Sequence, residues 1–434
     1  MSQPPRPVAS SVPYNPRNRR TPAGSVLVPM TPQEIEMYKH YRGIGTQSLL
    51  AKRKRSRSTS PDDPLCSCRQ APRWRRRKGS SNTVSLHPIH QSTHITRSMA
   101  LVFRYSCLKQ CADNLRPEVG VKQRLRSPII GLKNFNNWVK SVLITRFAHP
   151  VLATSTTKSI DGPSGGRGKV LDMGCGKGGD LVKWEKARIR ELIGVDIADV
   201  SIEQARDRWK GMRPPRFTAS FAALDCYTES LSKAFPPEKL AQPFDVVSMQ
   251  FCMHYAFETA EKARCMLQNI SQWLRKGGVF LGTIPNADYL LERLDSLPSS
   301  ATDLSFGNSV YKIRFEDRRS RRLFGHRYYF WLQDAVDDVP EYIVCWDKFV
   351  ELAAEYALYP IYKEEFHQIF AEHRDEEEFK SLMLRMKVVD ANGESAMDEE
   401  QWEAANIYIG FAFEKGMIGR RSFVSSHPAI YKHP

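Results

Sequence analysis

The stretch from Lys169 to Asp196, KVLDMGCGKGGDLVKWEKARIRELIGVD, predicts a strand, a glycine turn, a helix and a second strand. A short apolar run, Val170 and Leu171, ends at the acid Asp172, and a second apolar run ends at Asp196. Four glycines follow the first acid, at positions 174, 176, 178 and 179. Glycines at such a turn let the backbone approach a ligand, and an acid about 20 residues further on can accept a hydrogen bond from a ribose. The stretch therefore predicts a site for a nucleoside-containing cofactor.

The rest of the chain continues this alternation of strands and helices. Further strands are predicted over residues 217–224, 244–250, 279–284 and 407–413. Helices are predicted over residues 134–144, 199–212, 256–275, 346–357, 374–387 and 398–405. Gly277 and Gly278 are expected to end the helix over residues 256–275. The aromatic-rich segments YKIRF and RYYFWL, between residues 304 and 345, predict an inserted antiparallel hairpin. The pattern is typical of an α/β fold whose parallel sheet is covered on both faces.

The formal net charge of +16 is concentrated in the first 100 residues, which carry 18 Lys and Arg but only 4 Asp and Glu. This region is rich in Pro, Ser and Arg and shows no apolar period, so it is predicted to be disordered. Two basic clusters stand out in it, Lys52–Arg57 and Arg73–Lys78. A solvated tail is the simplest interpretation, and a nuclear-import signal or a non-specific RNA-binding arm is the sharper one.

Cysteine usage and hydropathy exclude several classes of protein. Nine scattered cysteines, an odd number, argue for a reducing compartment rather than a disulfide framework. The pairs Cys66/Cys68 and Cys107/Cys111 lack a second pair at zinc-site spacing, so no metal is expected. No apolar run approaches the roughly 18 residues of a membrane span, and the N-terminus lacks a signal peptide. The sequence thus predicts a soluble, intracellular protein that does not enter a membrane.

Two cofactor classes fit the glycine turn. Gly174, Gly176 and Gly179 satisfy the G-x-G-x-x-G pattern of dinucleotide sites, which alone is weak evidence. Dinucleotide folds usually have no acid two residues before the first glycine, where this chain has Asp172, and a third acid, Asp225, follows the third strand. Each acid singly is more often a strand-end or capping carboxylate. Together they suit a ligand with an ammonium, a ribose and an adenine, which describes S-adenosylmethionine.

The glycine turn resembles motif I of the class I methyltransferases. Longer segments resemble one family within that class. Seven segments resemble the mRNA cap guanine-N7 methyltransferase family: NFNNWVKSVLI, VLDMGCGKGGDLVKW, GVDIADVSIEQAR, FDVVSMQFCMHYAFE, GTIPNAD, DVPEYIV and IYIGFAFE. They occur in order and cover most of residues 117–415. The resemblance implies a Rossmann-like class I methyltransferase sheet, mostly parallel with a final antiparallel strand. It also implies methyl transfer from S-adenosylmethionine to the guanine N7 of a GpppN cap on mRNA.

The family motifs imply a set of cofactor-binding residues: Lys140, Asp172, Gly174, Gly176, Asp196, Asp225, Gln250 and Tyr255. Asp172 and the glycine turn would hold the methionine part, with Lys140 on its carboxylate. Asp196 would accept from the ribose hydroxyls and Asp225 from the adenine end.

The same resemblance implies a set of cap-binding residues: Asn136, Asn137, Lys177, Lys183, Arg208, His254, Glu341 and Tyr408. The cations would bind the triphosphate, and Glu341 would accept from the N1–H and amine edge of guanine. His254, Tyr255 and Phe251 would position the purine, which aromatic rings commonly stack against. Without the resemblance, the cations are more often surface charges and Phe251 more often belongs to the core.

The implied reaction needs no acid or base. Guanine N7 carries a free lone pair, so no proton must leave before it attacks the sulfonium methyl in line. Orientation of two reactants can lower the activation barrier by about 7–11 kcal/mol, and a water-excluding electrostatic environment lowers it further. We therefore expect no side chain to be an indispensable acid or base.

The predicted organisation has three parts: a disordered basic region over residues 1–115, a catalytic domain over 116–415 and a tail over 416–434. Upstream of the first helix the family usually carries a His-Tyr-Asn segment, whereas this chain has Asp113–Arg116. The resemblance implies capped mRNA, the capping guanylyltransferase and triphosphatase, and the RNA polymerase II machinery as partners. We expect a nuclear monomer.

Three rival functions stay open at this point. A catalytically inactive RNA-binding protein would not need the full set of cofactor acids and glycines. A small-molecule methyltransferase would not need the cation set or the inserted hairpin. A dehydrogenase would need a hydride-transfer constellation, for which the sequence offers no candidate.

Overall fold

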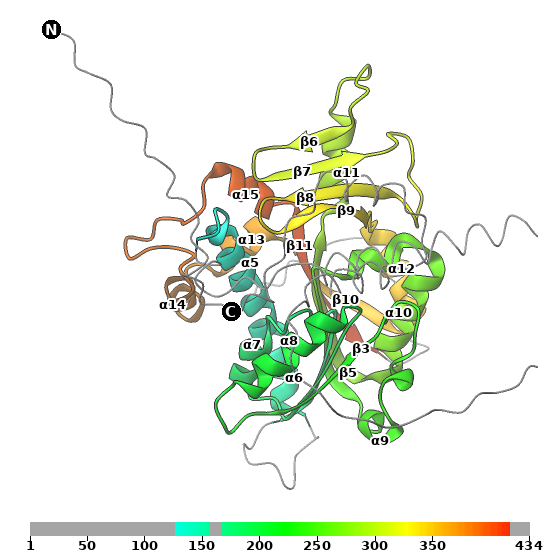
Figure 1. Ribbon diagram of the computed structural model, residues 1–434, viewed down its shortest axis with the longest axis vertical. Coiled ribbons are helices and arrows are strands. Elements are labelled where there is room, and N and C mark those ends of the chain that lie inside the picture. Colours follow the sequence, from blue (N-terminus) through cyan, green and yellow to red (C-terminus); the bar gives the residue numbers. More distant parts are fainter. Residues whose placement is uncertain (1–125, 156–166, 417–434) are drawn as a thin grey trace, which may run out of the picture. The chain divides into compact units, whose positions relative to one another are not determined.

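Seven strands form one sheet in the order β10-β11-β5-β4-β1-β2-β3 (Figure 1). The computed structural model describes residues 126–155 and 167–416. The strands of this sheet are β1 Lys169–Met173, β2 Glu191–Asp196, β3 Thr218–Ala223, β4 Phe244–Gln250, β5 Leu274–Pro285, β10 Leu358–Glu365 and β11 Tyr408–Lys415. Strands β1 to β5 pair in parallel, and β11 runs antiparallel to both β5 and β10. The predicted sheet, mostly parallel with a final antiparallel strand, is confirmed.

The helices occupy most of the intervals between strands. Helices that precede or follow the first three strands are α5 Ile130–Leu143, the π-helix η3 Ile144–Ala148, α6 His149–Ala153, α7 Leu181–Lys186 and α8 Asp199–Lys210. The later ones are η4 Leu231–Lys233, α9 Pro237–Leu240, η5 Met253–Glu258, α10 Ala260–Trp273, α11 Ala287–Asp295, α12 Trp346–Ala354, α13 Phe366–His373, α14 Glu377–Met386 and α15 Glu399–Ala405.

Alternating side chains of the strands serve the two faces of the sheet, as the pleat requires. On one face, Val170 and Leu192 pack with α6, α7 and α8. On the other, Leu171 and Ile193 pack with α10 and α12. Both faces are therefore covered, which explains why these strands read as continuous apolar runs in the sequence.

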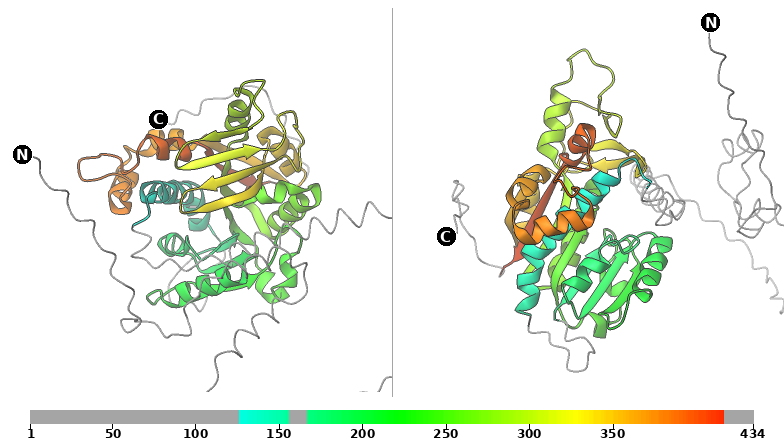
Figure 2. Two further views of the ribbon diagram at one scale, coloured as in Figure 1. Left: turned by 45° about the horizontal axis from the view of Figure 1, so that its top comes forward. Right: turned by 90° about the vertical axis from the view of Figure 1, so that its left-hand side faces the viewer.

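A second, antiparallel sheet has four strands, β6 Ser305–Gly307, β7 Tyr311–Phe315, β8 Arg327–Leu332 and β9 Val336–Tyr342. Its inner face shares an apolar cluster with α5, α11, α13, α14 and α15. The views of Figure 2 show α5 in cyan beside the orange helices of residues 366–405. This cluster attaches the segment before β1 to the segment before β11, so the two ends of the described chain meet in one core.

Several expectations about the elements need correction. Gly277 and Gly278 lie inside β5 and do not end a helix, because α10 already ends at Trp273. The predicted hairpin, β7 and β8, is part of a four-stranded sheet. Strands β9 and β10 were missed because each contains a proline, which usually argues against a strand interior.

Several interpretations fall outside the described residues. They concern the basic region of residues 1–115, its two basic clusters, the Cys66/Cys68 and Cys107/Cys111 pairs, Asp113–Arg116, and the tail beyond residue 416. These stay predictions.

Phe280 of β5 provides a test of the aromatic packing between β5 and β11. Its side chain is fully buried, with its ring centroid 5.2 Å from Phe411 and 6.0 Å from Phe413. Replacing Phe280 by Ala should lower the free energy of unfolding by about 3–5 kcal/mol, since it removes buried apolar contacts and leaves a cavity. Urea unfolding measures this. Ile361→Ala, at a side chain 47% exposed, is the control and should change little.

Candidate active site

The glycine turn after β1 owes its shape to backbone conformations that other residues rarely adopt. Gly174, Gly176 and Gly178 have φ angles of +73°, +51° and +70°. A side chain at Gly174 would come within 2.6 Å of the Cys252 sulfur. The N–H of Gly176 donates to Asp196 at 2.9 Å, so the acid that ends β2 also holds the turn in place. The turn is thus fixed from two sides while its backbone stays open to a ligand.

A cavity of about 430 Å³ lies at the carboxyl ends of β1 to β4. It brings together four of the predicted cofactor residues, Gly174, Asp196, Asp225 and Tyr255. Residues of β8, β9, η5 and α10 line its other wall. Ligands of α/β folds bind in this position, outside the carboxyl ends of parallel strands. The volume of the cavity and its two acids, Asp196 and Asp225, suit an adenosine.

Asp172, at the end of β1, is a buried carboxylate with an abnormal pKa. Burial, together with the nearby Asp180 carboxylate, raises the pKa of Asp172 to about 7. A buried acid whose charge is this costly is a functional-site candidate, because a cationic ligand would relieve the cost. The ammonium of an amino acid is such a ligand.

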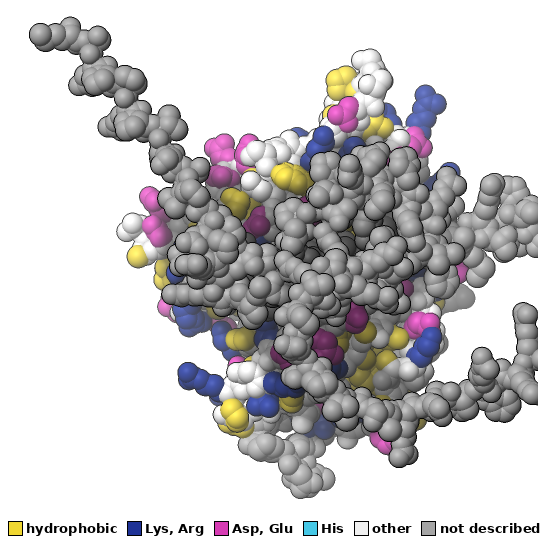
Figure 3. Space-filling model, viewed as in Figure 1, with side chains coloured by type: hydrophobic (Ala, Val, Ile, Leu, Met, Phe, Trp, Pro, Cys, Tyr) yellow, Lys and Arg dark blue, Asp and Glu magenta, His cyan; other side chains and the backbone are white. Residues whose placement is uncertain are grey.

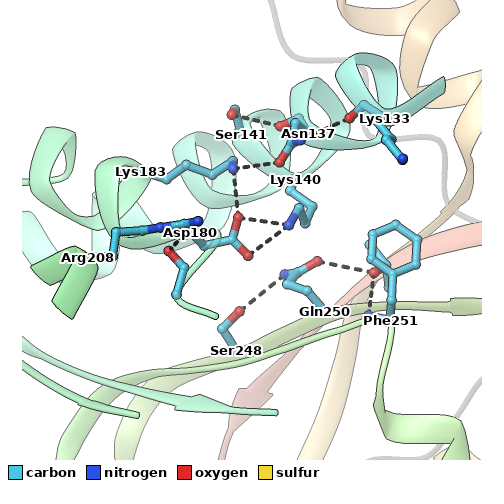
Figure 4. Close-up of polar contacts among 12 residues, drawn as sticks. Lys133, Asn137, Lys140, Ser141, Asp180, Lys183, Arg208, Ser248, Gln250 and Phe251 are labelled. Carbon is cyan, nitrogen blue, oxygen red and sulfur yellow. Dashed lines mark hydrogen bonds and ion pairs between the residues drawn. The ribbon is translucent and has the colours of Figure 1, made fainter. Parts of the chain in front are cut away.

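Beside Asp172, a network of ion pairs centres on Asp180 (Figure 4). Lys140 approaches the Asp180 carboxylate to 2.8 Å and Lys183 approaches it to 2.6 Å. Lys183 also donates to the Asn137 side chain at 3.1 Å. Burial alone would raise the pKa of Asp180, but the two ammonium groups outweigh burial and hold that pKa well below its ordinary value. The network ties α5 to the start of α7.

This network differs from the expected arrangement in two respects. Sequence reasoning missed Asp180, although this acid directly follows the glycines and precedes α7. Lys183 was expected to bind phosphate, but its ammonium is engaged in the network and its side chain is only 13% exposed. Lys140 likewise pairs with Asp180 here. Figure 4 shows Gln250, which donates to Ser248 and accepts from Thr283, next to Lys140.

Glu341, on β9, is the centre of a second polar cluster. Tyr255 donates to one of its oxygens at 2.9 Å and Tyr328 to the other at 2.8 Å. The Nε2 atom of His254 lies 3.3 Å from Glu341, and both side chains are almost fully buried. Burial alone would raise the pKa of Glu341, but His254 and the two hydroxyls outweigh it, so this pKa is lowered. The carboxylate is therefore held charged, able to accept from a ligand.

The predicted aromatic residues lie next to this cluster. Phe251 and Tyr408 meet edge to face, with their ring centroids 4.9 Å apart. Phe251 has a φ of +59°, unusual for a bulky residue, and its N–H donates to both oxygens of Thr283. Such strain persists only where the surrounding structure enforces it, often at ligand sites. Tyr255 belongs to both regions, since it also lines the cavity.

The remaining predicted cap residues lie on α8, in the glycine turn and on α5. Arg208 donates from α8 to the Gly178 carbonyl at 3.2 Å, and Lys177 is in the turn itself. The side-chain oxygen of Asn136 is buried and accepts no hydrogen bond from the described part of the chain. An unpaired buried acceptor of this kind is costly unless a ligand satisfies it.

Comparison with known proteins settles the family. The mRNA (guanine-N(7))-methyltransferase domain matches residues 109–416, well over half of the chain. The chain belongs to this family. The match begins before the first described residue, 126, and ends one residue after β11.

Curated relatives agree with this assignment. The mRNA cap guanine-N(7) methyltransferase of Cryptococcus neoformans var. neoformans serotype D (strain JEC21) is 54% identical over 303 residues, 70% of this chain and 46% of that protein. That of Schizosaccharomyces pombe is 46% identical over 310 residues, 70% of this chain and 80% of that protein. The mRNA cap guanine-N(7) methyltransferase 1 of Arabidopsis thaliana is 40% identical, over 68% of this chain and 77% of that protein. The chain spans less than half the length of the Cryptococcus relatives.

Two further properties of the methyltransferase domain concern metals and membranes. Within residues 126–155 and 167–416, no group of three or more His, Cys, Asp or Glu side chains is arranged to hold a metal ion. Among the helices of these same ranges, none combines the length and the apolar character that crossing a bilayer requires.

Asp172 should make the stability of the ligand-free domain fall as pH rises. Its folded-state pKa of about 7 exceeds the ordinary value of 3.8, so the folded state binds more protons between these values. Asp172→Asn removes this titration. The variant should match the unmodified domain at about pH 4 and exceed its free energy of unfolding at about pH 8. Urea unfolding at a series of pH values measures the difference, and an equal effect at both pH values would refute it.

The Glu341 cluster can be tested with a matched pair of hydroxyl deletions. Tyr328→Phe removes a donor from a buried carboxylate and should lower the free energy of unfolding by about 1–3 kcal/mol. Tyr329→Phe removes the neighbouring hydroxyl, which donates to the exposed Glu316 at 3.1 Å, and should cost less than about 0.5 kcal/mol. Equal losses in thermal or urea unfolding would contradict the buried cluster.

Proposed function

We propose that this protein transfers the methyl group of S-adenosylmethionine to N7 of the guanine cap of mRNA. The observation that carries the proposal is the joining of two sites through Tyr255. One side of this residue lines the cavity of Asp196 and Asp225, and its hydroxyl donates to Glu341. A methyl donor in the cavity and a purine against Glu341 would thus be neighbours.

The cofactor site would use the acids at the strand ends. Asp196 would accept from the ribose hydroxyls and Asp225 from the adenine end. Asp172 would accept from the methionine ammonium, since a cation relieves a buried carboxylate. Lys140, Gln250 and the glycine turn at Gly174 and Gly176 would complete the site. Bound there, S-adenosylmethionine supplies an electrophilic methyl group.

The purine site would use charge and ring contacts. The charged Glu341 would accept from the N1–H and amine edge of guanine, and Phe251 and Tyr408 would bound the ring. His254 would position Glu341 and the purine. Asn136 has a buried free acceptor suited to the same ligand, and Asn137 would lie beside it through its contact with Lys183.

The triphosphate would meet Lys177 and Arg208 beside the glycine turn. Lys183 would act on it less directly, by holding Asp180 and Asn137. None of these groups has to remove a proton, since guanine N7 is unprotonated when it attacks. Proximity and a fixed electrostatic environment would account for the rate.

The wider setting follows from the same proposal. The protein would act in the nucleus on capped mRNA, as a monomer, alongside the capping guanylyltransferase and triphosphatase and the RNA polymerase II machinery. The basic N-terminal region of residues 1–115 would aid import or RNA binding, the catalytic domain would extend over 116–415, and the tail over 416–434 has no assigned role.

Incubation of the purified protein with methyl-labelled S-adenosylmethionine and GpppA tests the activity. Label should appear on guanine N7. Glu341→Gln keeps the shape of the side chain but removes its charge, and should reduce kcat/KM for GpppA by about 10²-fold or more. Binding of S-adenosylmethionine should change little, because Glu341 faces the purine.

Asp196→Asn provides the complementary variant and should weaken S-adenosylmethionine binding. Calorimetry with each ligand separates the two effects. If the unmodified protein binds the cofactor but does not methylate GpppA, the proposed substrate is rejected. If it does not bind the cofactor, the proposed methyltransferase activity itself is rejected.

A further inference from the structure

We propose that the C-terminal half of α8 and the loop after it bind the phosphates of the RNA that follows the cap. The proposal rests on the proposed function, because the RNA would reach this surface only as the continuation of a bound cap. The surface consists of residues 206–216, RDRWKGMRPPR, and is called the basic strip below. It carries five Lys and Arg against one Asp, a net charge of +4 in 11 residues.

Little within the domain neutralises the outer part of the basic strip. Lys210 approaches Asp207 only to 3.4 Å, and both side chains are more than half exposed, so this pair is weak. Arg213 is exposed and forms no ion pair with any residue of the described ranges. These cations are available to phosphates, whose contacts provide most of the affinity in nucleic-acid binding.

The basic strip also contains a stacked pair suited to a nucleotide base. The guanidinium of Arg216 lies 4.5 Å from the centre of the Trp209 ring. Trp209 is itself fixed, because its indole N–H donates to the Phe217 carbonyl at 3.0 Å. A guanidinium plane held in this way offers its outer face to an unstacked base. Single-stranded binding sites commonly combine such a plane with a row of cations.

The basic strip is continuous with the proposed triphosphate site. Arg208 belongs to both, and its hydrogen bond to Gly178 joins α8 to the turn that carries Lys177. The solvent side of this turn is open, since a side chain at Gly176 or Gly179 would meet no atom within 4 Å. The described residues around Gly176 and Gly179 therefore leave room for phosphates that continue from the turn toward α8.

The opposite wall of the site suits phosphates less well. Asp337 and Asp338 of β9, with Glu258, line the cavity there. Arg314 pairs with Asp338 at 2.8 Å and Lys262 pairs with Glu258 at 2.6 Å, so the wall keeps only a small negative charge, which disfavours phosphates. Figure 3 shows dark-blue Lys and Arg side chains at the lower left, where Figure 1 places α7 and α8. Charge complementarity thus favours the α8 side for the RNA, because the basic strip carries the larger net charge of the two surfaces.

The test compares a capped RNA of about 20 nucleotides with the dinucleotide GpppA, which lacks the RNA body. The variant is Lys210→Gln combined with Arg213→Gln. Its KM for the RNA should rise roughly tenfold, and the slope of log affinity against log salt should fall by about 1.4, which is 0.7 for each lost contact. Its kcat/KM for GpppA should stay within about twofold of the unmodified protein, since neither residue reaches the cap.

A matched control removes the same charge elsewhere. Lys239→Gln with Lys348→Gln, on α9 and α12, should leave the RNA KM unchanged. Urea unfolding confirms that both double variants are folded. The inference would be overturned if the basic-strip variant lost kcat/KM equally for RNA and GpppA, or lost none for RNA. It would also be overturned if the variant bound RNA as before but no longer bound an acidic phosphopeptide. Failure of the unmodified protein to methylate GpppA would instead refute the proposed function.

Discussion

The ion pairs of Asp180 with Lys140 and Lys183 are the constraint on which the site depends. A buried carboxylate is tolerated only when paired, and removal of one partner from such a pair commonly costs several kcal/mol. Here the two ammonium groups come from α5 and α7. The pairing therefore fixes a helix that precedes the sheet against the turn that follows its first strand. It also places a second negative charge near Asp172, which keeps that acid ready for a cation.

The two sheets divide the chemistry between them. The parallel sheet contributes acids at its strand ends, a consequence of the βα alternation that leaves those ends open. The antiparallel sheet contributes Glu341 and Tyr328 from adjacent strands, held opposite each other by the register of β8 and β9. Neither sheet alone could form both halves of the site. The proposed function would therefore draw on both the glycine turn and an insertion late in the chain.

The sequence predicted the parallel sheet, the glycine turn and the acids because each rests on local pattern: apolar runs, glycine spacing and strand ends. Glu341 and Tyr255 were also among the expected site residues, through family motifs rather than through physics, and their roles stay predictions. The sequence did not predict Asp180 as a partner of Lys140, since 40 residues separate them and only the folded chain brings α5 beside the end of the glycine turn. Tyr328 was missed for a similar reason: within RYYFWL, only the strand register decides which tyrosine faces Glu341. Strands β9 and β10 were not predicted, because each contains a proline and proline has a low propensity for strand interiors.

Tyr255 lines the cavity at the strand ends, while its hydroxyl donates to Glu341, the centre of the proposed purine site. Ligands in the cavity and at Glu341 would thus share a wall. A displacement of this wall by either ligand is felt by the other, and thermodynamic linkage then requires that each affinity change by the same factor. Under the proposed function, binding of the cofactor and binding of the cap would then be coupled, each changing the affinity of the domain for the other.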